Sequence, residues 1–343
     1  RFGGIYMNDK KVLVLGGTGA MGVYVVPELL RLGYKTDVVA LDNIGVDNDC
    51  LRFIKKNGKD ISALTEILKN DYDAIIDFML YTTDEFKDRY ELFLKNTKHY
   101  IFLSSYRVYA DKDIIITENS PRLISVSKDE EFIKSDDYAM AKCRQENILE
   151  NSPFMNWTIV RPSIVYSKRR FQLVAYEANI FVARALQNKK VTLQKEAMDV
   201  QATMTWAGDI AKMITRLILN PGAYREKFTL STAEHNSWRY VKNCYERIIG
   251  LQIEEVDYDT YMKIRVCKPE QYNSLKWQID YDRLFNRIVD NSKILAVTGL
   301  KQKDFMPLEK GLETELNSLP KDWKWNENEE VSKKMDQYLA DKL

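Results

Sequence analysis

A tyrosine and a lysine are spaced so that they could act together in proton transfer. Tyr138 and Lys142 stand four positions apart in the stretch Asp137-Tyr-Ala-Met-Ala-Lys142. A helix has about 3.6 residues per turn, so side chains at this spacing lie on one face, about a turn apart. A lysine ammonium stabilises a tyrosine phenolate, which would let the phenol exchange a proton with a substrate. Because the same spacing also arises by chance on solvated helices, its meaning depends on the surrounding motifs.

A glycine loop upstream predicts a site for the phosphates of a dinucleotide. Gly16, Gly19 and Gly22 lie between an apolar run at 11–15, typical of a buried strand, and a segment at 23–32 with helical spacing. Glycines there permit a tight turn and let a pyrophosphate approach the backbone at a helix N-terminus, where free N–H groups favour an anion. A merely tight turn between strand and helix is the alternative.

Asp42 indicates which dinucleotide is bound. It follows the next expected strand, at 36–41. A carboxylate at that place accepts hydrogen bonds from both ribose hydroxyls and repels a 2′-phosphate, so we expect NAD as the cofactor rather than NADP. The alternative is an aspartate that only forms a turn.

Strand and helix patterns alternate along the first half of the chain. The expected strands lie at 11–15, 36–41, 74–78, 100–103 and 157–160, and the expected helices at 23–32, 64–68, 89–94 and from 138 to about 150. This alternation predicts an α/β fold with a doubly wound parallel sheet, covered by helices on both faces.

The later half is less regular and predicts a division of the chain. We expect an NAD-binding Rossmann domain at 7–166, a smaller mixed α+β substrate lobe at 167–320 that can interleave with it, and a charged C-terminal helix or tail at 321–343. Short strands are expected in the later half at 190–193, 227–230 and 253–256. Residues 1–6 are set aside as a leader before Met7.

Composition limits the classes of partner. Lys and Arg number 51 against 50 Asp and Glu, so no basic field favours nucleic acid or a membrane surface, and we expect neither as a partner. The four cysteines and two histidines lack metal-site spacing, so we expect no metal, and reduced thiols are typical of a cytoplasmic protein. No apolar run reaches the roughly 18 residues of a membrane span. A homodimer is compatible with the sequence.

Taken together, the motifs resemble those of the extended short-chain dehydrogenase/reductases, in particular the NAD-dependent epimerase/dehydratase family that includes UDP-galactose 4-epimerase. The resemblance rests, in chain order, on the glycine loop, Asp42, Asp60-Ile61, Ser104-Ser105-x-x-Val108-Tyr109, Tyr138-x-x-x-Lys142 and Arg161-Pro162. It is specific over 11–166 and continues more weakly through Trp206-Ala-Gly-Asp209 and Asp290-Asn-Ser-Lys293.

The resemblance implies roles for individual residues. Tyr138 would take a proton from a sugar hydroxyl as hydride leaves for the nicotinamide, Lys142 would hold the nicotinamide ribose, and Ser105 would hydrogen-bond the reacting oxygen. The residues expected to contact NAD are Gly16, Gly19, Ala20, Met21, Gly22, Asp42, Asp60, Ile61, Phe78, Tyr138 and Lys142. Arg169, Arg170 and Arg265 are candidates to meet a nucleotide diphosphate, and a solvated basic turn is the alternative for Arg169 and Arg170.

Two departures from the family pattern bear on the reaction. Tyr106-Arg107 follows Ser105 where the family's 4,6-dehydratases carry acidic residues, which argues against elimination of water. Asp77-Phe78-Met79 replaces the usual His-x-Ala-Gly and weakens a 4-epimerase assignment. The sequence favours an NAD-dependent epimerase that acts on a nucleotide-diphosphate sugar through transient oxidation and hydride return. An NAD(P)-dependent reductase or dehydrogenase with the same catalytic residues is the alternative.

A non-catalytic binder is the remaining alternative. Val256-Asp-Tyr258 and Asp77-Phe78 resemble, more weakly, the chloroplast stem-loop RNA-binding relatives of the family. Retention of Ser105, Tyr138 and Lys142 argues against a pure binder, and the near-neutral charge argues against RNA as the ligand.

Overall fold

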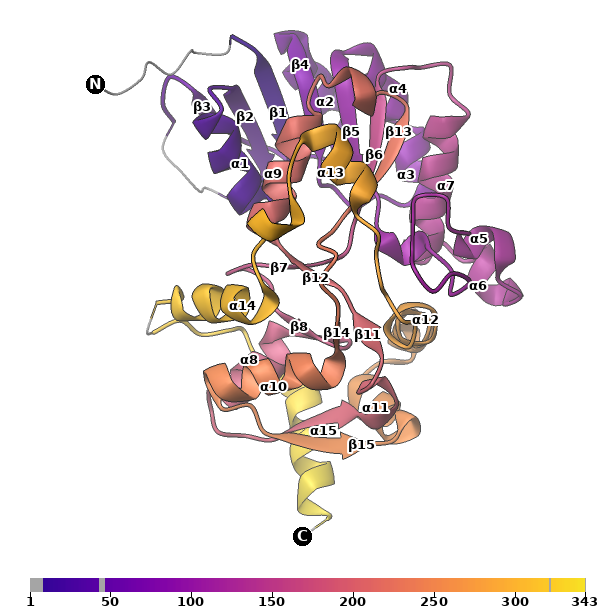
Figure 1. The fold of residues 1–343 in the computed structure, drawn as a ribbon, viewed down its shortest axis with the longest axis vertical. Helices are drawn as coiled ribbons and strands as arrows, with labels where there is room; N and C mark the ends of the chain where they lie inside the picture. The colour runs from indigo at the N-terminus through magenta and orange to yellow at the C-terminus, as the bar shows by residue number, and fades with distance from the viewer. Residues whose placement is uncertain (1–8, 43–46, 321, 343) are drawn as a thin grey trace.

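The computed structural model describes residues 9–42, 47–320 and 322–342. Residues 1–6, which we set aside as a leader, lie outside the described residues. Seven parallel strands form the central sheet, in the order β13-β6-β5-β4-β1-β2-β3 (Figure 1). Their bounds are β1 (Lys11–Leu15), β2 (Lys35–Ala40), β3 (Leu51–Lys55), β4 (Tyr72–Asp77), β5 (Thr97–Leu103), β6 (Trp157–Pro162) and β13 (Glu226–Leu230).

The strand order explains where a ligand can bind. From β1 the chain moves outward to β2 and β3, then returns to β4 on the other side of β1. This is the order of a doubly wound dinucleotide-binding sheet, and it leaves a crevice outside the carboxyl ends of β1 and β4. The predicted α/β fold is confirmed.

Helices cover both faces of the sheet, which is why its central strands are apolar throughout. On one face Val12 and Val14 of β1 pack into a core with α1 (Gly22–Arg31), α9 (Ala207–Leu217) and α13 (Ser292–Thr298). On the other face Leu13 and Leu15 pack into a core with α2 (Ile61–Ile67), α3 (Thr83–Lys87), α4 (Tyr90–Lys95) and α7 (Tyr138–Glu150). The expected helices at 23–32, 64–68, 89–94 and 138–150 correspond to α1, α2, α4 and α7.

A second lobe, with its own hydrophobic core, lies beyond the carboxyl ends of the strands (Figure 1). Its helices are α8 (Ala178–Ala185), α10 (Trp238–Ile249), α11 (Tyr258–Arg265), α12 (Tyr272–Gln278), α14 (Leu308–Asn317) and α15 (Glu329–Ala340). Its strand pairs are β7 (Ile164–Tyr166) with β12 (Met204–Trp206), β8 (Gln172–Leu173) with β9 (Tyr176–Glu177), β10 (Val191–Gln194) with β15 (Ile253–Val256), and β11 (Gln201–Ala202) with β14 (Asn236–Ser237).

The chain returns to the sheet after it has entered the second lobe. The residues at 227–230, which we expected among the short strands of the later half, form β13 at the edge of the main sheet beside β6. Helices α9 and α13 also cover the sheet, although they follow residue 166. A division of the chain at 166 stays a prediction.

The charged C-terminal segment forms α15, which packs against α8 and α11. Val331 and Met335 are buried there, and Arg184 donates to Asp336 at 2.7 Å. Within the described ranges, no helix has the length and apolarity to cross a membrane. In the same part of the chain, no three His, Cys, Asp or Glu side chains gather where they could hold a metal ion.

Candidate active site

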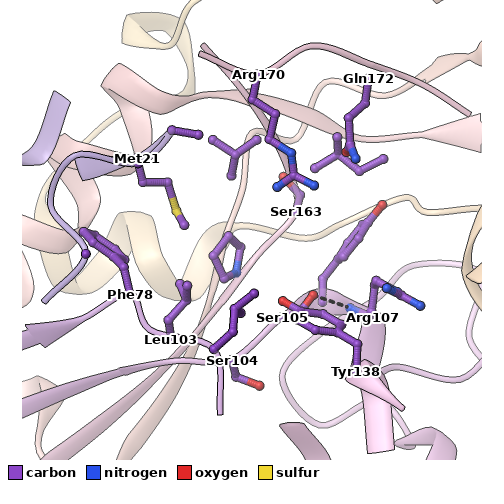
Figure 2. Close-up of a pocket in the computed structure, with 18 of the residues that line it drawn as sticks. Met21, Phe78, Leu103, Ser104, Ser105, Arg107, Tyr138, Ser163, Arg170 and Gln172 are labelled. Carbon is purple, nitrogen blue, oxygen red and sulfur yellow. Dashed lines mark hydrogen bonds between the residues drawn. The ribbon is translucent and has the colours of Figure 1, made fainter. Parts of the chain in front are cut away.

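A cavity of about 490 Å³ opens between the carboxyl ends of the strands and the second lobe. The loops that follow β1, β4, β5 and β6 supply one side of it. Arg170 and Gln172 lie on the opposite side from Ser105 and Tyr138 in Figure 2, with Met21 and Phe78 at one end. The cavity is therefore placed at the crevice that the strand order predicts.

The glycine loop forms the end of the cavity next to β1. Gly16 has φ +74°, a left-handed conformation that favours glycine. A Cβ on Gly22 would lie 2.2 Å from the carbonyl oxygen of Gly17, so helix α1 can approach the loop only with glycine there. A Cβ on Gly19 would have its nearest neighbour at 3.5 Å, which leaves room for a ligand against the backbone.

Helix α1 begins where the loop meets the cavity. Its first hydrogen bond runs from the Val23 N–H to the Gly19 carbonyl at 3.1 Å, so the N–H groups of Ala20, Met21 and Gly22 belong to the open first turn. All three residues line the cavity. Free N–H groups at a helix N-terminus fit a pyrophosphate.

A smaller cavity of about 260 Å³ continues on the other side of Gly16. Asp42 lines it and accepts a hydrogen bond from Thr18 Oγ1 at 3.1 Å. Lys56, which the sequence did not single out, lines it as well. The two cavities share Gly16 in their linings and together extend from the end of β2 to the ends of β5 and β6, a span that fits an extended dinucleotide.

Asp60 and Ile61 are not among the residues that line either cavity. The Asp60 carboxylate caps α2 by accepting from the Ala63 N–H at 3.1 Å. Ile61 is the first residue of α2 and is exposed. An Asp before a helix also has this capping explanation, which competes with a role at the cofactor.

Ser105 and Tyr138 lie together on the sheet side of the cavity (Figure 2). Ser105 comes two residues after the end of β5, and its Oγ accepts from the Arg107 backbone N–H at 3.1 Å. Tyr138 is the first residue of α7. The structure therefore brings both predicted side chains to one cavity from separate elements.

Lys142 lies one turn further along α7 and is buried. Its Nζ donates to the Leu103 carbonyl at 2.6 Å and lies 6.0 Å from the centre of the Tyr138 ring. Burial lowers the pKa of Lys142 to about 8, although the carboxylates of Asp77 and Glu146 act in the other direction. The structure therefore places the Lys142 ammonium near the Tyr138 ring, although no hydrogen bond joins the two side chains.

Two buried carboxylates support this region. Asp77 accepts from the Met79 N–H at 3.0 Å and from the Tyr100 hydroxyl at 2.8 Å, and burial raises its pKa. Glu146 accepts from Ser104 Oγ at 2.5 Å and pairs with Arg161 at 2.7 Å. Burial disfavours the charged form of Glu146, but the arginine holds its pKa below the usual value.

Of the three arginines expected to meet a diphosphate, only Arg170 lines the large cavity, where it pairs with Glu177 at 3.0 Å. Arg169 is exposed outside the cavity. Arg265 also lies outside and donates to the Ala175 carbonyl at 3.3 Å.

Two further arginines line the cavity, and sequence reasoning did not assign either to the site. Arg283 is buried, and its Nε donates to the Val174 carbonyl at 2.7 Å. Burial lowers the pKa of Arg283 to about 10. Arg107 stands beside Tyr138. Its residue type had already marked it as a departure from the dehydratase pattern, whereas Arg283 belongs to no motif.

Solved structures resemble this chain over most of its length. The UDP-glucose 4-epimerase of Thermus thermophilus in complex with NAD is 16% identical with a TM-score of 0.64, and the match covers 90% of this chain and 98% of that one. The Bordetella bronchiseptica enzyme WbmH in complex with NAD+ is 15% identical with a TM-score of 0.67, over 90% and 98% of the two chains. The dTDP-glucose 4,6-dehydratase of Bacillus anthracis in complex with NAD is 18% identical with a TM-score of 0.67, over 90% and 96%.

At these identities the likeness shows the fold, and no curated protein matches the sequence. The family model for the NAD dependent epimerase/dehydratase family matches residues 12–229. That span contains the glycine loop, Ser105, Tyr138 and Lys142, and it reaches from β1 into β13. The resemblance inferred from the motifs is thereby confirmed. The chain belongs to the NAD-dependent epimerase/dehydratase family of enzymes.

Proposed function

We propose that this enzyme epimerises the sugar of a nucleoside-diphosphate sugar through transient oxidation and return of hydride. One observation carries the proposal: Ser105 and Tyr138 share a cavity with the glycine loop, while arginines of the second lobe line its other side. The glycine loop matches the cofactor, Ser105 and Tyr138 match the sugar, and the arginines match the diphosphate.

The residues at the β1 end fit NAD. The N–H groups of Ala20, Met21 and Gly22 would hold the pyrophosphate, and Asp42 would accept the ribose hydroxyls. When bound, NAD supplies an acceptor that takes hydride from the sugar carbon and gives it back. Lys142 would hold the nicotinamide ribose, although its side chain is buried and is not among the residues that line the cavity.

Side chains of the protein itself would accept the proton and position the substrate oxygen. Tyr138 would accept the proton of the sugar hydroxyl at the carbon that is oxidised, and Lys142 would stabilise the resulting phenolate. The Ser105 Oγ already accepts from the Arg107 N–H, so its own proton is available for the substrate oxygen. That hydrogen bond would place the oxygen between Ser105 and Tyr138.

Epimerisation fits the cavity better than dehydration does. Among the described residues that line it there is no Asp or Glu. Elimination of water requires an additional acid and base beside the sugar, and no carboxylate stands there to supply them. Inversion at a carbon needs only that hydride returns to the opposite face of the oxidised sugar.

The second lobe would bind the diphosphate. Arg170 and Arg283 line the cavity on that side. Guanidinium groups bind phosphate oxygens through paired N–H donors, so this wall suits the nucleotide end of the substrate. The sugar would then lie between the arginines and Tyr138.

The test is a panel of UDP-, GDP- and dTDP-sugars, each compared with its free sugar. We expect a nucleotide sugar to raise the melting temperature of the NAD complex far more than the free sugar does. The same sugar should give an isomer by NMR without net formation of NADH. Net NADH would instead indicate a dehydrogenase, a product lighter by one water would indicate a dehydratase, and a panel without any thermal shift would contradict a nucleotide-sugar substrate.

A further inference from the structure

Arg107 places a positive charge beside the groups that transfer the proton. It lies in the short helical turn Tyr106–Val108, two residues after Ser105, and lines the same cavity. Its Cζ lies 5.0 Å from the centre of the Tyr138 ring, and its side chain is only 15% exposed. Figure 2 shows Arg107 next to Tyr138, on the opposite side from Arg170.

The hydrogen-bonding capacity of Arg107 is not used up by the protein. Its Nε is buried and has no hydrogen-bond partner among the described residues. The nearest carboxylate is that of Asp137, whose Oδ2 forms an ion pair with Nη2 at 3.9 Å; that distance is too long for a hydrogen bond, and Oδ2 is itself buried without a hydrogen-bond partner. A guanidinium stays charged in proteins, and a desolvated donor without a partner is unfavourable. The group is therefore poised to receive an acceptor from a ligand.

The other two arginines of the cavity each have a carboxylate within hydrogen-bond distance, which Arg107 lacks. Arg170 pairs with Glu177, and Arg283 pairs with Asp282. Both belong to the second lobe, where the nucleotide diphosphate would lie, whereas Arg107 comes from the sheet side and follows Ser105. A neutral sugar offers no anion to a cation at that position.

We propose that the sugar of the substrate carries a carboxylate, as in a nucleotide-linked uronic acid, and that Arg107 binds it. This inference rests on the proposed function and narrows the substrate class of the same site. The planar fork of N–H donors in a guanidinium matches the two oxygens of a carboxylate. The carboxylate would lie on the sugar ring near the carbon whose hydroxyl meets Tyr138 and Ser105.

The experiment compares matched ligands that differ only in the oxidation of one carbon. Binding to the NAD complex is measured by calorimetry for UDP-glucose against UDP-glucuronate and for GDP-mannose against GDP-mannuronate. Each pair is measured on the unmutated enzyme, on Arg107→Gln, and on Arg31→Gln as a control. Arg31 lies at the far end of α1, where it pairs with Glu28.

For at least one of the two ligand pairs, we expect the uronic acid to bind roughly 10- to 100-fold more tightly than the neutral sugar. This is the gain in affinity that a hydrogen-bonded ion pair gives. Arg107→Gln should abolish that preference and leave the neutral sugar within about threefold, while Arg31→Gln should retain the preference. If Arg107→Gln does not fold, Arg107→Lys keeps the charge without the fork and should retain only part of the preference.

Two results would overturn this inference while leaving the proposed function intact. The first is equal affinity for the acid and its neutral partner. The second is an equal loss of both ligands in Arg107→Gln, which would assign Arg107 to the diphosphate. If no member of either pair binds the NAD complex, the inference falls together with the nucleotide-sugar assignment.

Discussion

Lys142 should lower the free energy of unfolding at neutral pH, because its charged side chain is buried in the folded protein. Burial lowers its pKa to about 8 in the folded protein, against a value near 10.5 in the unfolded chain. Between these two values the unfolded chain binds more protons than the folded protein, so the free energy of unfolding rises with pH. At pH 7 the buried ammonium costs roughly 3 kcal/mol relative to the neutral amine, and by pH 9.5 that cost falls by roughly 2 kcal/mol.

Replacing Lys142 with Met removes this dependence on pH. The variant loses the hydrogen bond to the Leu103 carbonyl, which subtracts about 1 kcal/mol or more at every pH. The difference in unfolding free energy between the unmutated enzyme and Lys142→Met should therefore shift by roughly 2 kcal/mol in favour of the unmutated enzyme from pH 7 to pH 9.5.

Urea denaturation of the NAD-free protein at both pH values measures this shift, and the titrating groups that do not interact with Lys142 cancel in the difference. Lys134→Met is the control, because the Lys134 side chain is 75% exposed and pairs with Glu130 on the surface. Its effect should be the same at pH 7 and pH 9.5. The reasoning would be refuted if the difference in unfolding free energy between the unmutated enzyme and Lys142→Met were the same at pH 7 and pH 9.5. Lys142 would then carry no unusual desolvation cost.

Three other changes give distinct outcomes. Tyr138→Phe should lower turnover by about 10²–10⁴-fold and leave NAD affinity in calorimetry nearly unchanged, because only a proton-transfer group is lost; a normal rate would move the chemistry elsewhere. The unmutated enzyme should bind NAD more tightly than NADP in calorimetry, and Asp42→Ala should reduce the difference between the two affinities. Tighter binding of NADP than of NAD by the unmutated enzyme would contradict the role of Asp42. Glu146→Gln should lower the unfolding free energy in urea by roughly 3 kcal/mol or more, because it leaves the buried Arg161 without its charged partner; a loss under about 1 kcal/mol would mean that the pair is not needed.

The sequence revealed the sheet because burial on both faces leaves a signal in each central strand. Runs such as Lys11–Leu15 are apolar at almost every position, so their type can be read without knowing their neighbours. Strand β3 was missed because it lies at the sheet edge and has only half-buried and exposed residues, without a fully buried position. The strand at 227–230 was recognised, but its partner was not, because nothing in a strand's own pattern says which sheet it joins.

The residues of the site likewise fall into those that a sequence motif marks and those that no motif marks. The glycine loop, Ser105 and the Tyr138–Lys142 pair follow motifs whose spacing reflects local geometry, and the structure gathers them at the predicted edge. Arg283 reaches the cavity from a π-helical turn, Ile279–Arg283, that no motif marks. Such a residue is placed by how the second lobe folds against the sheet, which is not written in the neighbouring sequence.

The buried charges around Glu146 show how the fold holds the elements that carry Ser105 and Tyr138, the residues of the proposed proton transfer. Glu146 belongs to α7, the helix that Tyr138 begins, and it binds Ser104, the neighbour of Ser105. Its bond to Arg161 of β6 ties the same helix to a second strand of the sheet. One carboxylate therefore sets the helix that carries the phenol against the strand end that carries the serine. Loss of Glu146 should thus disturb the Ser105–Tyr138 pair even though Glu146 itself lies outside the cavity.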